Sequence, residues 1–192
     1  MHEATLEDVH GKGSQTILTW EGSNGVELTY RINQYAQRPF LLLQLSLRNH
    51  SQKPLNLHEL VLLHAPCGNM RVDPKERGLD FFKVGWHGWA YSGLRRAHKR
   101  EIRTLLSQLT RDQYSNPTTQ LFRKVGEFSS EGWAILSNER VALVVGLASM
   151  ADQFGQVTAT CRPGDLGLRL GVQADGILIA PGEGCDSEWG YL

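Results

Sequence analysis

The feature of this 192-residue sequence that most limits its fold is a series of short apolar runs separated by turn-forming residues. The runs are rich in strand formers, and they either alternate between apolar and polar residues or are apolar throughout, which is the pattern of β-strands. The predicted strands are 15–20, 26–33, 40–48, 55–63, 80–91, 120–128, 132–136, 141–148, 153–160, 166–172 and 176–180. About eleven strands at this spacing are typical of β-sandwiches and barrels.

Turn residues predict how the first strands connect. Asn24 and Gly25 stand between the first two runs, and an Asn-Gly pair favours a tight hairpin turn. The polar stretch from Ser51 to Pro54 separates the third and fourth runs and predicts a second hairpin. In the third run, alternate residues are expected to form one buried face. These residues are Leu41, Leu43, Leu45 and Leu47.

One segment departs from the strand pattern. The apolar residues of 94–110 partly follow helical spacing, with basic residues between them, so this segment predicts a short helix or a long excursion. No repeat of fixed period occurs, and strands do not alternate with helices, which argues against solenoids, propellers and parallel α/β sheets. The sequence therefore predicts a single all-β domain over 1–192, a large antiparallel β-sandwich with at most one short helix.

The charge balance limits the expected classes of binding partner, and the cysteine content limits the expected cellular compartment. Lysine plus arginine (20) equals aspartate plus glutamate (20), so no broad field favours nucleic acid or an anionic membrane, and a neutral ligand fits better. Cys67, Cys161 and Cys185 are odd in number and show no CxxC spacing, which favours a reducing compartment. Residues 1–15 do not resemble a secretory signal, and the apolar run 141–148 is too short to span a bilayer. A cytoplasmic location is predicted.

Motifs that would carry catalytic chemistry are missing from the sequence. It contains no GxSxG, GxxxxGK or HExxH pattern. His58, His64 and Cys67 are residue types that bind metals, but the two histidines would lie far apart along one strand, so no metal and no cofactor are predicted. A glycosidase uses two carboxylates across the scissile bond, and no spacing pairs any two acidic residues here. The unassigned candidates are Glu59, Asp73, Asp80, Glu127 and Glu131.

The densest aromatic patch is segment 81–93, which contains Phe81, Phe82, Trp86, Trp89 and Tyr91. On one extended strand, Phe81, Trp89 and Tyr91 would face one side and Phe82 and Trp86 the other, so one face can pack while the other meets a ligand. Aromatic rings stack on the apolar face of a pyranose, which makes a sugar the natural ligand for Trp89 or Tyr91. On the pattern alone, a core position for both tryptophans is the stronger interpretation.

The order Phe-Phe-x-x-Gly-Trp-x-x-Trp-x-x-Ser-Gly in this segment resembles the N-terminal domain of α-galactosidases of the melibiase and raffinose-hydrolase type. Segments 126–136, 141–148, 152–154, 179–183 and 187–188 are similar to that family in order and spacing. The resemblance covers most of the chain from Phe40 onward. It implies a galactose mutarotase-like supersandwich, followed by a catalytic (β/α)8 barrel and a small C-terminal β domain.

The resemblance also implies a role for individual residues. The catalytic aspartates of the family lie on the barrel, so this chain alone is expected to be inactive and none of its residues is assigned as catalytic. The second tryptophan of the motif, here Trp89, reaches the galactose pocket in the family, within one subunit or across an oligomer interface, while Trp86 packs. His87 and Gly88 replace a common Gln-Ser pair, and His87 can donate to a sugar hydroxyl. Tyr91 completes the predicted substrate-binding set.

The expected partners are an α-galactoside or related sugar, the catalytic barrel and further copies of the chain in a homo-oligomer. The surface that meets the barrel should then carry exposed apolar area. Two alternatives stay open: a free-standing carbohydrate-binding sandwich in which Trp86, Trp89 and Tyr91 form a platform, and a structural domain whose tryptophans are all buried.

Overall fold

The computed structural model describes residues 1–72, 75, 77–85, 91–101 and 124–192, and this part of the chain contains strands and no helix. The strands are β1 (His2–Asp8), β2 (Gly11–Glu21), β3 (Val26–Tyr35), β4 (Leu41–Asn49), β5 (Leu55–Ala65), β6 (Asp80–Lys83), β7 (Gly93–Arg95), β8 (Glu127–Glu131), β9 (Trp133–Ser137), β10 (Ala142–Leu147), β11 (Phe154–Arg162), β12 (Asp165–Ile179), β13 (Gly184–Asp186) and β14 (Gly190–Tyr191). Neighbouring strands pair antiparallel, and the sheets pack as in a sandwich. The predicted all-β sandwich is confirmed.

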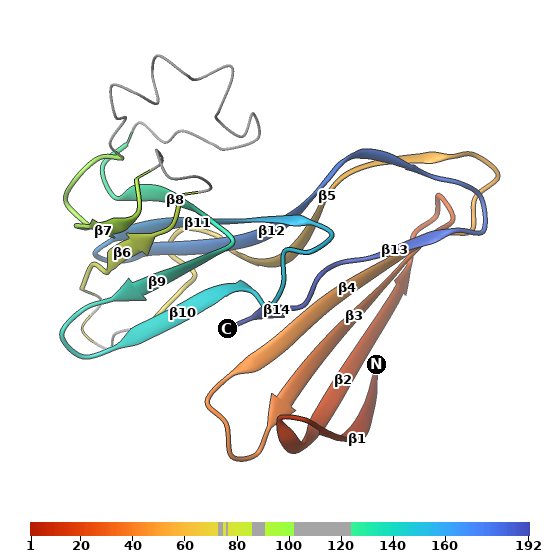
Figure 1. The fold of residues 1–192 in the computed structure, drawn as a ribbon, viewed down its shortest axis with the longest axis horizontal. Coiled ribbons are helices and arrows are strands. Elements are labelled where there is room, and N and C mark those ends of the chain that lie inside the picture. The colour runs from red at the N-terminus through yellow and green to blue at the C-terminus, as the bar shows by residue number, and fades with distance from the viewer. Residues whose placement is uncertain (73–74, 76, 86–90, 102–123) are drawn as a thin grey trace. The chain divides into compact units, whose positions relative to one another are not determined.

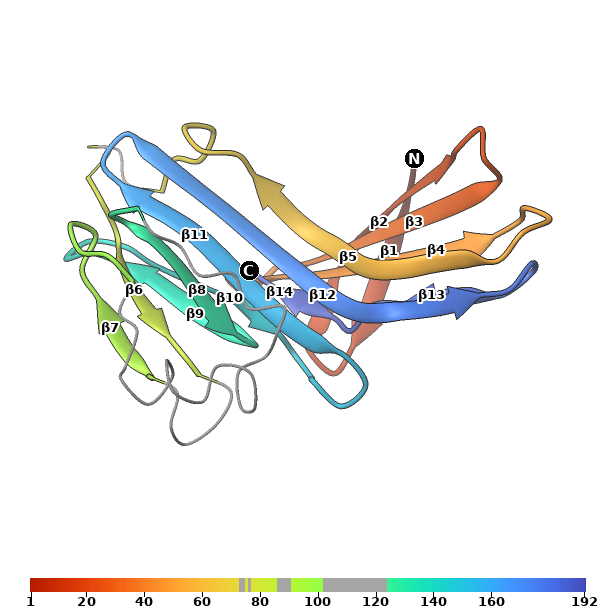
Figure 2. The same ribbon diagram turned by 90° about the horizontal axis from the view of Figure 1, so that it is seen from above.

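The described residues group into two compact units, each assembled from segments that are distant in sequence. The first unit comprises Met1–Leu62, Leu147–Phe154 and Val172–Leu192, and the second comprises Leu63–Gly146 and Gly155–Gly171. The long strands β5 and β12 are neighbours in one sheet, and each contributes residues to both units (Figures 1 and 2).

The first unit is built on the sheet β1-β2-β3-β4, with β13 and β14 both paired to β4 (Figure 1). Tyr30 of β3 donates a hydrogen bond from its hydroxyl to the carbonyl oxygen of Leu62 at 2.6 Å, which joins this sheet to β5. Two of the four leucines predicted to form the buried face of β4, Leu43 and Leu47, are buried, and the other two are half-buried. The remaining core side chains of this unit include Leu57, Leu60, Leu62, Val172, Ala174 and Ile179.

The two predicted hairpins have different outcomes. The first is confirmed: the amide of Gly25 donates to the carbonyl of Gly22 at 3.0 Å, and Gly25 adopts a φ of 74°, which favours glycine. The second is wrong, because β5 lies beside β12 and not beside β4. The chain leaves the sheet after Asn49, whose side-chain amide donates to the carbonyls of Lys53 and Ile179 at 2.8 and 2.9 Å. Hydrogen bonds from the Asn49 side chain therefore hold this connection. The prediction had assumed a hairpin in which the third and fourth predicted strands pair.

The second unit packs the sheet β10-β9-β6-β7 against β8, β11 and the adjoining part of β12. Phe81 of β6 stacks on Phe128 of β8, with ring centroids 5.6 Å apart and an interplanar angle of 17°. Both rings are completely buried, so they mark the centre of this core. The other fully buried apolar side chains of the unit are Leu79, Ala134, Leu136, Val145, Val157, Cys161 and Leu170.

The segment predicted as a helix or an excursion, 94–110, begins in strand β7, so the helical alternative is wrong for its first residues. Phe81 pairs with Arg95 and Phe82 with Leu94, which places these residues in the sheet. Residues 102–110 lie outside the described residues. Within the described ranges, no helix is long and apolar enough to cross a membrane.

The three cysteines are free, and they are expected to differ sharply in reactivity. Burial, with the Asp80 carboxylate adding to the effect, raises the pKa of the Cys161 thiol to about 12, whereas Cys67 is exposed. Because the thiolate is the reactive species, a disulfide reagent at neutral pH should label Cys67 in the native protein and Cys161 only after unfolding. Native labelling that persists in Cys67→Ser at the wild-type extent would contradict this assignment.

The same pKa shift predicts a pH dependence of stability. The pKa of the Cys161 thiol is about 12 in the folded protein and has its ordinary value of 9.0 in the unfolded chain. The group therefore contributes stability that is fully present below pH 9.0 and is lost as the pH rises toward 12. Urea unfolding followed from pH 8 upward should show a steeper decline for the wild type than for Cys161→Val.

Candidate functional site

The described ends of the aromatic segment 81–93 belong to two strands, β6 and β7, which pair antiparallel as the two sides of a hairpin. Strand β6 ends at Lys83, and β7 returns beside it, with Lys83 paired to Gly93. The predicted strand 80–91 is confirmed at Asp80–Lys83 and wrong at Val84, Gly85 and Tyr91, which lie outside the strands, while residues 86–90 lie outside the described residues. Trp86, His87 and Trp89 lie outside the described residues, whereas Tyr91 is described.

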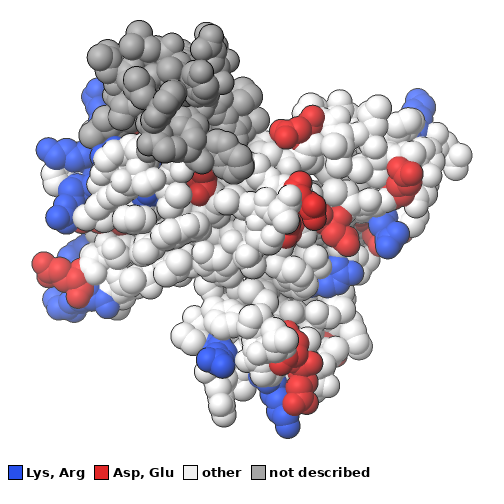
Figure 3. Space-filling view, in the orientation of Figure 1, with Lys and Arg blue, Asp and Glu red and all other residues white. Residues whose placement is uncertain are grey.

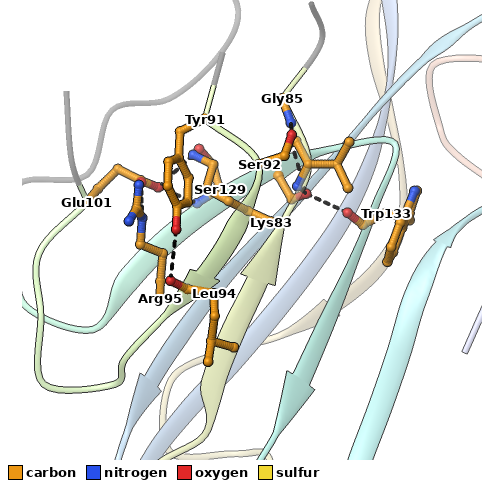
Figure 4. A network of polar contacts seen from close by, with 11 residues as sticks. Lys83, Gly85, Tyr91, Ser92, Leu94, Arg95, Glu101, Ser129 and Trp133 are labelled. Carbon is orange, nitrogen blue, oxygen red and sulfur yellow. Dashed lines mark hydrogen bonds and ion pairs between the residues drawn. The ribbon is translucent and has the colours of Figure 1, made fainter. Parts of the chain in front are cut away.

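Hydrogen bonds fix the two sides of this hairpin where they approach its tip (Figure 4). We call residues 83–85 and 91–95 the hairpin base. The amide of Gly85 donates to Ser92 Oγ at 3.0 Å, which closes the base across the two sides. The amide of Val84 donates to Ser130 Oγ at 2.7 Å, and the carbonyl of Val84 accepts from the amide of Glu131 at 3.0 Å. Strand β8 therefore anchors the side that enters the tip.

A buried ionic cluster lies beside the hairpin base. It consists of Lys83 on β6, Arg95 on β7 and Glu101, whose side chains are 14%, 6% and 3% exposed (Figure 4). Lys83 Nζ lies 3.0 Å from Glu101 Oε2, and Arg95 Nε lies 3.5 Å from Glu101 Oε1. The second contact is an ion pair without a hydrogen bond, because Nε has no hydrogen-bond partner among the described residues. The amide of Ser129 on β8 also donates to Glu101 Oε2, at 3.3 Å.

Tyr91 is held directly by this cluster. The guanidinium carbon of Arg95 lies 3.3 Å from the centroid of the Tyr91 ring, a cation–π contact, and the Tyr91 hydroxyl donates to the carbonyl of Leu94 at 3.2 Å. Gly93 makes room for this arrangement: it adopts a φ of 147°, and a Cβ there would lie 2.7 Å from the Tyr91 hydroxyl oxygen. The ring orientation is thus set by Arg95, Leu94 and Gly93 together.

Trp133 extends the aromatic surroundings of the hairpin. Its ring stacks on Phe82 with centroids 5.7 Å apart and an interplanar angle of 22°, and its carbonyl accepts a hydrogen bond from Ser130 Oγ. Sequence reasoning placed Trp133 in a strand but did not connect it with the aromatic segment. It also missed Arg95, Glu101 and Ser130, for which the only signal was the basic character of the residues after the hairpin.

Two of the carboxylates that are candidates for acid–base work, Asp80 and Glu127, are engaged in separate ion pairs. Asp80 Oδ2 lies 2.5 Å from Arg96 Nη1, and Glu127 Oε1 lies 3.5 Å from Arg162 Nη1 and 3.7 Å from Lys124 Nζ. Asp73 lies outside the described residues. None of the carboxylates was predicted to be catalytic, and these surroundings give no reason to assign one.

Metal ligands do not define a site in the part of the chain that the structure describes, and large charged areas do not define one on the face drawn in Figure 3. No group of three His, Cys, Asp or Glu side chains in the described ranges could hold a metal ion. On the face drawn in Figure 3, basic and acidic side chains are interspersed, with broad uncharged areas between them. The hairpin base with its buried cluster is therefore the candidate site.

Comparisons with known proteins identify the fold. No family model matches the chain, and no curated protein sequence matches it. Among solved structures, the chain is similar to the α-galactosidase from Lactobacillus brevis, with a TM-score of 0.57 and 11% sequence identity. The match covers 98% of this chain and 24% of that chain, so this chain spans about a quarter of the length of its structural neighbour. This chain thus adopts, over nearly its whole length, a fold that is also found in part of an α-galactosidase.

Proposed function

We propose that this chain is a non-catalytic β-sandwich domain of an α-galactosidase-like glycoside hydrolase, which presents aromatic residues of its hairpin to a sugar. The observation that carries the proposal is the anchored hairpin at segment 81–93, in a fold that an α-galactosidase shares. A hairpin whose base is fixed by hydrogen bonds and a buried ionic cluster can hold side chains at its tip in a defined place, as recognition of a sugar requires.

Four residues form the proposed sugar-binding set. Trp89 stacks on the apolar face of the sugar, Trp86 supports the tip, and His87 donates to a hydroxyl. Tyr91 is the described member, and Arg95 occupies one face of its ring. The opposite face and the ring edge are the parts of Tyr91 that meet the ligand.

The catalytic groups are proposed to come from a partner domain. Retaining glycoside hydrolysis needs two carboxylates on opposite sides of the scissile bond and no cofactor. We propose that a (β/α)8 barrel supplies them and that copies of the whole protein associate as a homo-oligomer. The first unit exposes large apolar side chains that suit such contacts, notably Ile177 and Leu178, which are 44% and 69% exposed.

The test is a titration of the chain with galactose and raffinose, followed by tryptophan fluorescence, for wild type and Trp89→Ala. We expect the variant to bind about tenfold more weakly, or ~1.4 kcal/mol, because a stacked aromatic ring contributes energy of this order. Trp20→Ala is the matched control, since Trp20 is an exposed tryptophan on β2 of the first unit, and it should bind as wild type does.

Hydrolysis of an aryl α-galactoside is measured on the same samples. The chain should release no product, because no acid–base pair is assigned to it. Turnover by the purified chain would contradict the non-catalytic role, and equal affinities of wild type and Trp89→Ala would contradict the proposed site.

A further inference from the structure

The carboxylate of Glu101 joins three strands of the second unit that belong to two different sheets. It contacts Lys83 on β6 and Arg95 on β7, and it accepts a hydrogen bond from the backbone of Ser129 on β8. Strands β6 and β7 lie in one sheet and β8 in the other. A single buried group therefore fixes the hairpin base relative to the opposite sheet.

Because this ionic cluster is buried, removing one of its charges is expected to be costly. Arg95 and Glu101 are removed almost completely from water, at 6% and 3% exposed, and Lys83 is 14% exposed. A buried ion pair contributes little when complete, but removing one partner leaves the other charge without compensation in a medium of low dielectric constant. Loss of the Glu101 charge would leave Lys83 and Arg95 as neighbouring buried cations. A movement toward water would restore the solvation of these two cations, and the hairpin base would move with them.

Such a movement would affect both sides of the hairpin base. Arg95 carries the Tyr91 ring at 3.3 Å, on the side where the chain leaves the tip. Lys83 directly precedes Val84 and Gly85, whose amides are held by Ser130 and Ser92 on the side where the chain enters it. Both sides of the hairpin thus depend on contacts that begin at Glu101.

We propose that Glu101 is a positioning residue for the hairpin base, acting through Lys83 and Arg95, so that ligand affinity at Tyr91 depends on a carboxylate that does not touch the ligand. The part that concerns ligand affinity rests on the proposed sugar-binding function. The part that concerns the position of the hairpin does not, so the two can fail separately.

The test is hydrogen exchange of the backbone amides in Glu101→Gln, a substitution that keeps size and polarity but removes the charge. We expect exchange of the Val84 and Gly85 amides to become at least about tenfold faster, while amides of β11 in the same unit keep their protection. In a parallel titration with raffinose, the dissociation constant should rise about fivefold.

The matched control is Glu127→Gln. Glu127 lies in the same unit, is 15% exposed and also sits between two cations, Arg162 and Lys124. It should leave exchange at Val84 and Gly85 at the wild-type rate. Glu101→Asp provides a second variant that keeps the charge, and it should accelerate exchange at the same two amides to a smaller extent.

The outcomes separate the two ideas. Faster exchange confined to the hairpin base supports the positioning role, whether or not the sugar binds. Equal acceleration throughout the second unit, or none in either Glu101 variant, would overturn it and leave Glu101 as a general stabilising residue. Absence of sugar binding by the wild type would count against the proposed function alone.

Discussion

Phe81→Ala is expected to destabilise the protein by about 3–5 kcal/mol, the range measured when a fully buried aromatic side chain is truncated. The Phe81 ring is completely buried and stacks on Phe128, which is also completely buried. Its strand pairs with β9, where the directly opposed residue, Leu136, is buried as well. A cavity at this position is enclosed by well-packed strands and cannot be refilled by solvent, so most of the lost contact energy should appear in the free energy of unfolding.

Phe82→Ala is the matched control for this effect. Phe82 is the next residue in the chain and also stacks on an aromatic ring, that of Trp133, but its side chain is only partly buried. Its truncation should cost about 1–2 kcal/mol in urea unfolding experiments. Similar losses for the two variants would show that the core of the second unit is not centred on Phe81.

The strands that could be predicted from sequence are those whose buried positions are occupied by runs of apolar residues. The apolar run 141–148 corresponds to β10, and 153–160 corresponds to β11, in which seven consecutive residues are buried. Strand β1 was not predicted, because most of its side chains are exposed and polar. Its pairing with β2 depends on backbone hydrogen bonds, which leave no pattern of apolar residues in the sequence. Strands β13 and β14 are too short to show a period.

Strand β12 shows the opposite error, since it was predicted as two separate strands. Asp175 and Gly176, at the boundary between the predicted strands 166–172 and 176–180, adopt positive φ values of 50° and 78°. The strand nevertheless continues through them from Asp165 to Ile179. The prediction of two strands is therefore wrong, because sheet pairing continues through two residues with positive φ, which no local pattern reveals.

Part of the candidate site could be predicted from sequence and part could not. The aromatic segment could be singled out because its composition is unusual and its order resembles that of a known family. The cluster behind it could not, because Glu101 meets Lys83 across 18 residues and Ser129 across 28. Such contacts depend on which strands become neighbours and in which register. That information is distributed over two sheets and has no signature in any one window of sequence.

Asn49→Ala is the second substitution for which a large loss is expected, about 3 kcal/mol or more. The side chain of Asn49 is completely buried at the point where the chain leaves β4, and its amide nitrogen donates to the carbonyls of Lys53 and Ile179. Its Oδ1 accepts hydrogen bonds from the backbone amide and the hydroxyl of Ser51, at 3.0 and 2.6 Å. Alanine would leave the Ile179 carbonyl of β12 without this partner inside the protein, and an unsatisfied buried polar group costs about 1–3 kcal/mol.

Asn24→Ala separates this effect from the ordinary preference of asparagine for turns. Asn24 is exposed in the hairpin between β2 and β3, where its Oδ1 accepts one hydrogen bond from the amide of Val26 at 3.3 Å. Water can replace that bond, so its loss should cost about 1 kcal/mol or less in urea unfolding. If Asn49→Ala lost no more than Asn24→Ala, backbone bonds such as that from the Asn49 amide to Glu183 would suffice to hold the connection. A much larger loss would show that the Asn49 side chain, and not the backbone hydrogen bonds alone, stabilises the connection by which the chain leaves β4 and enters β5 beside β12.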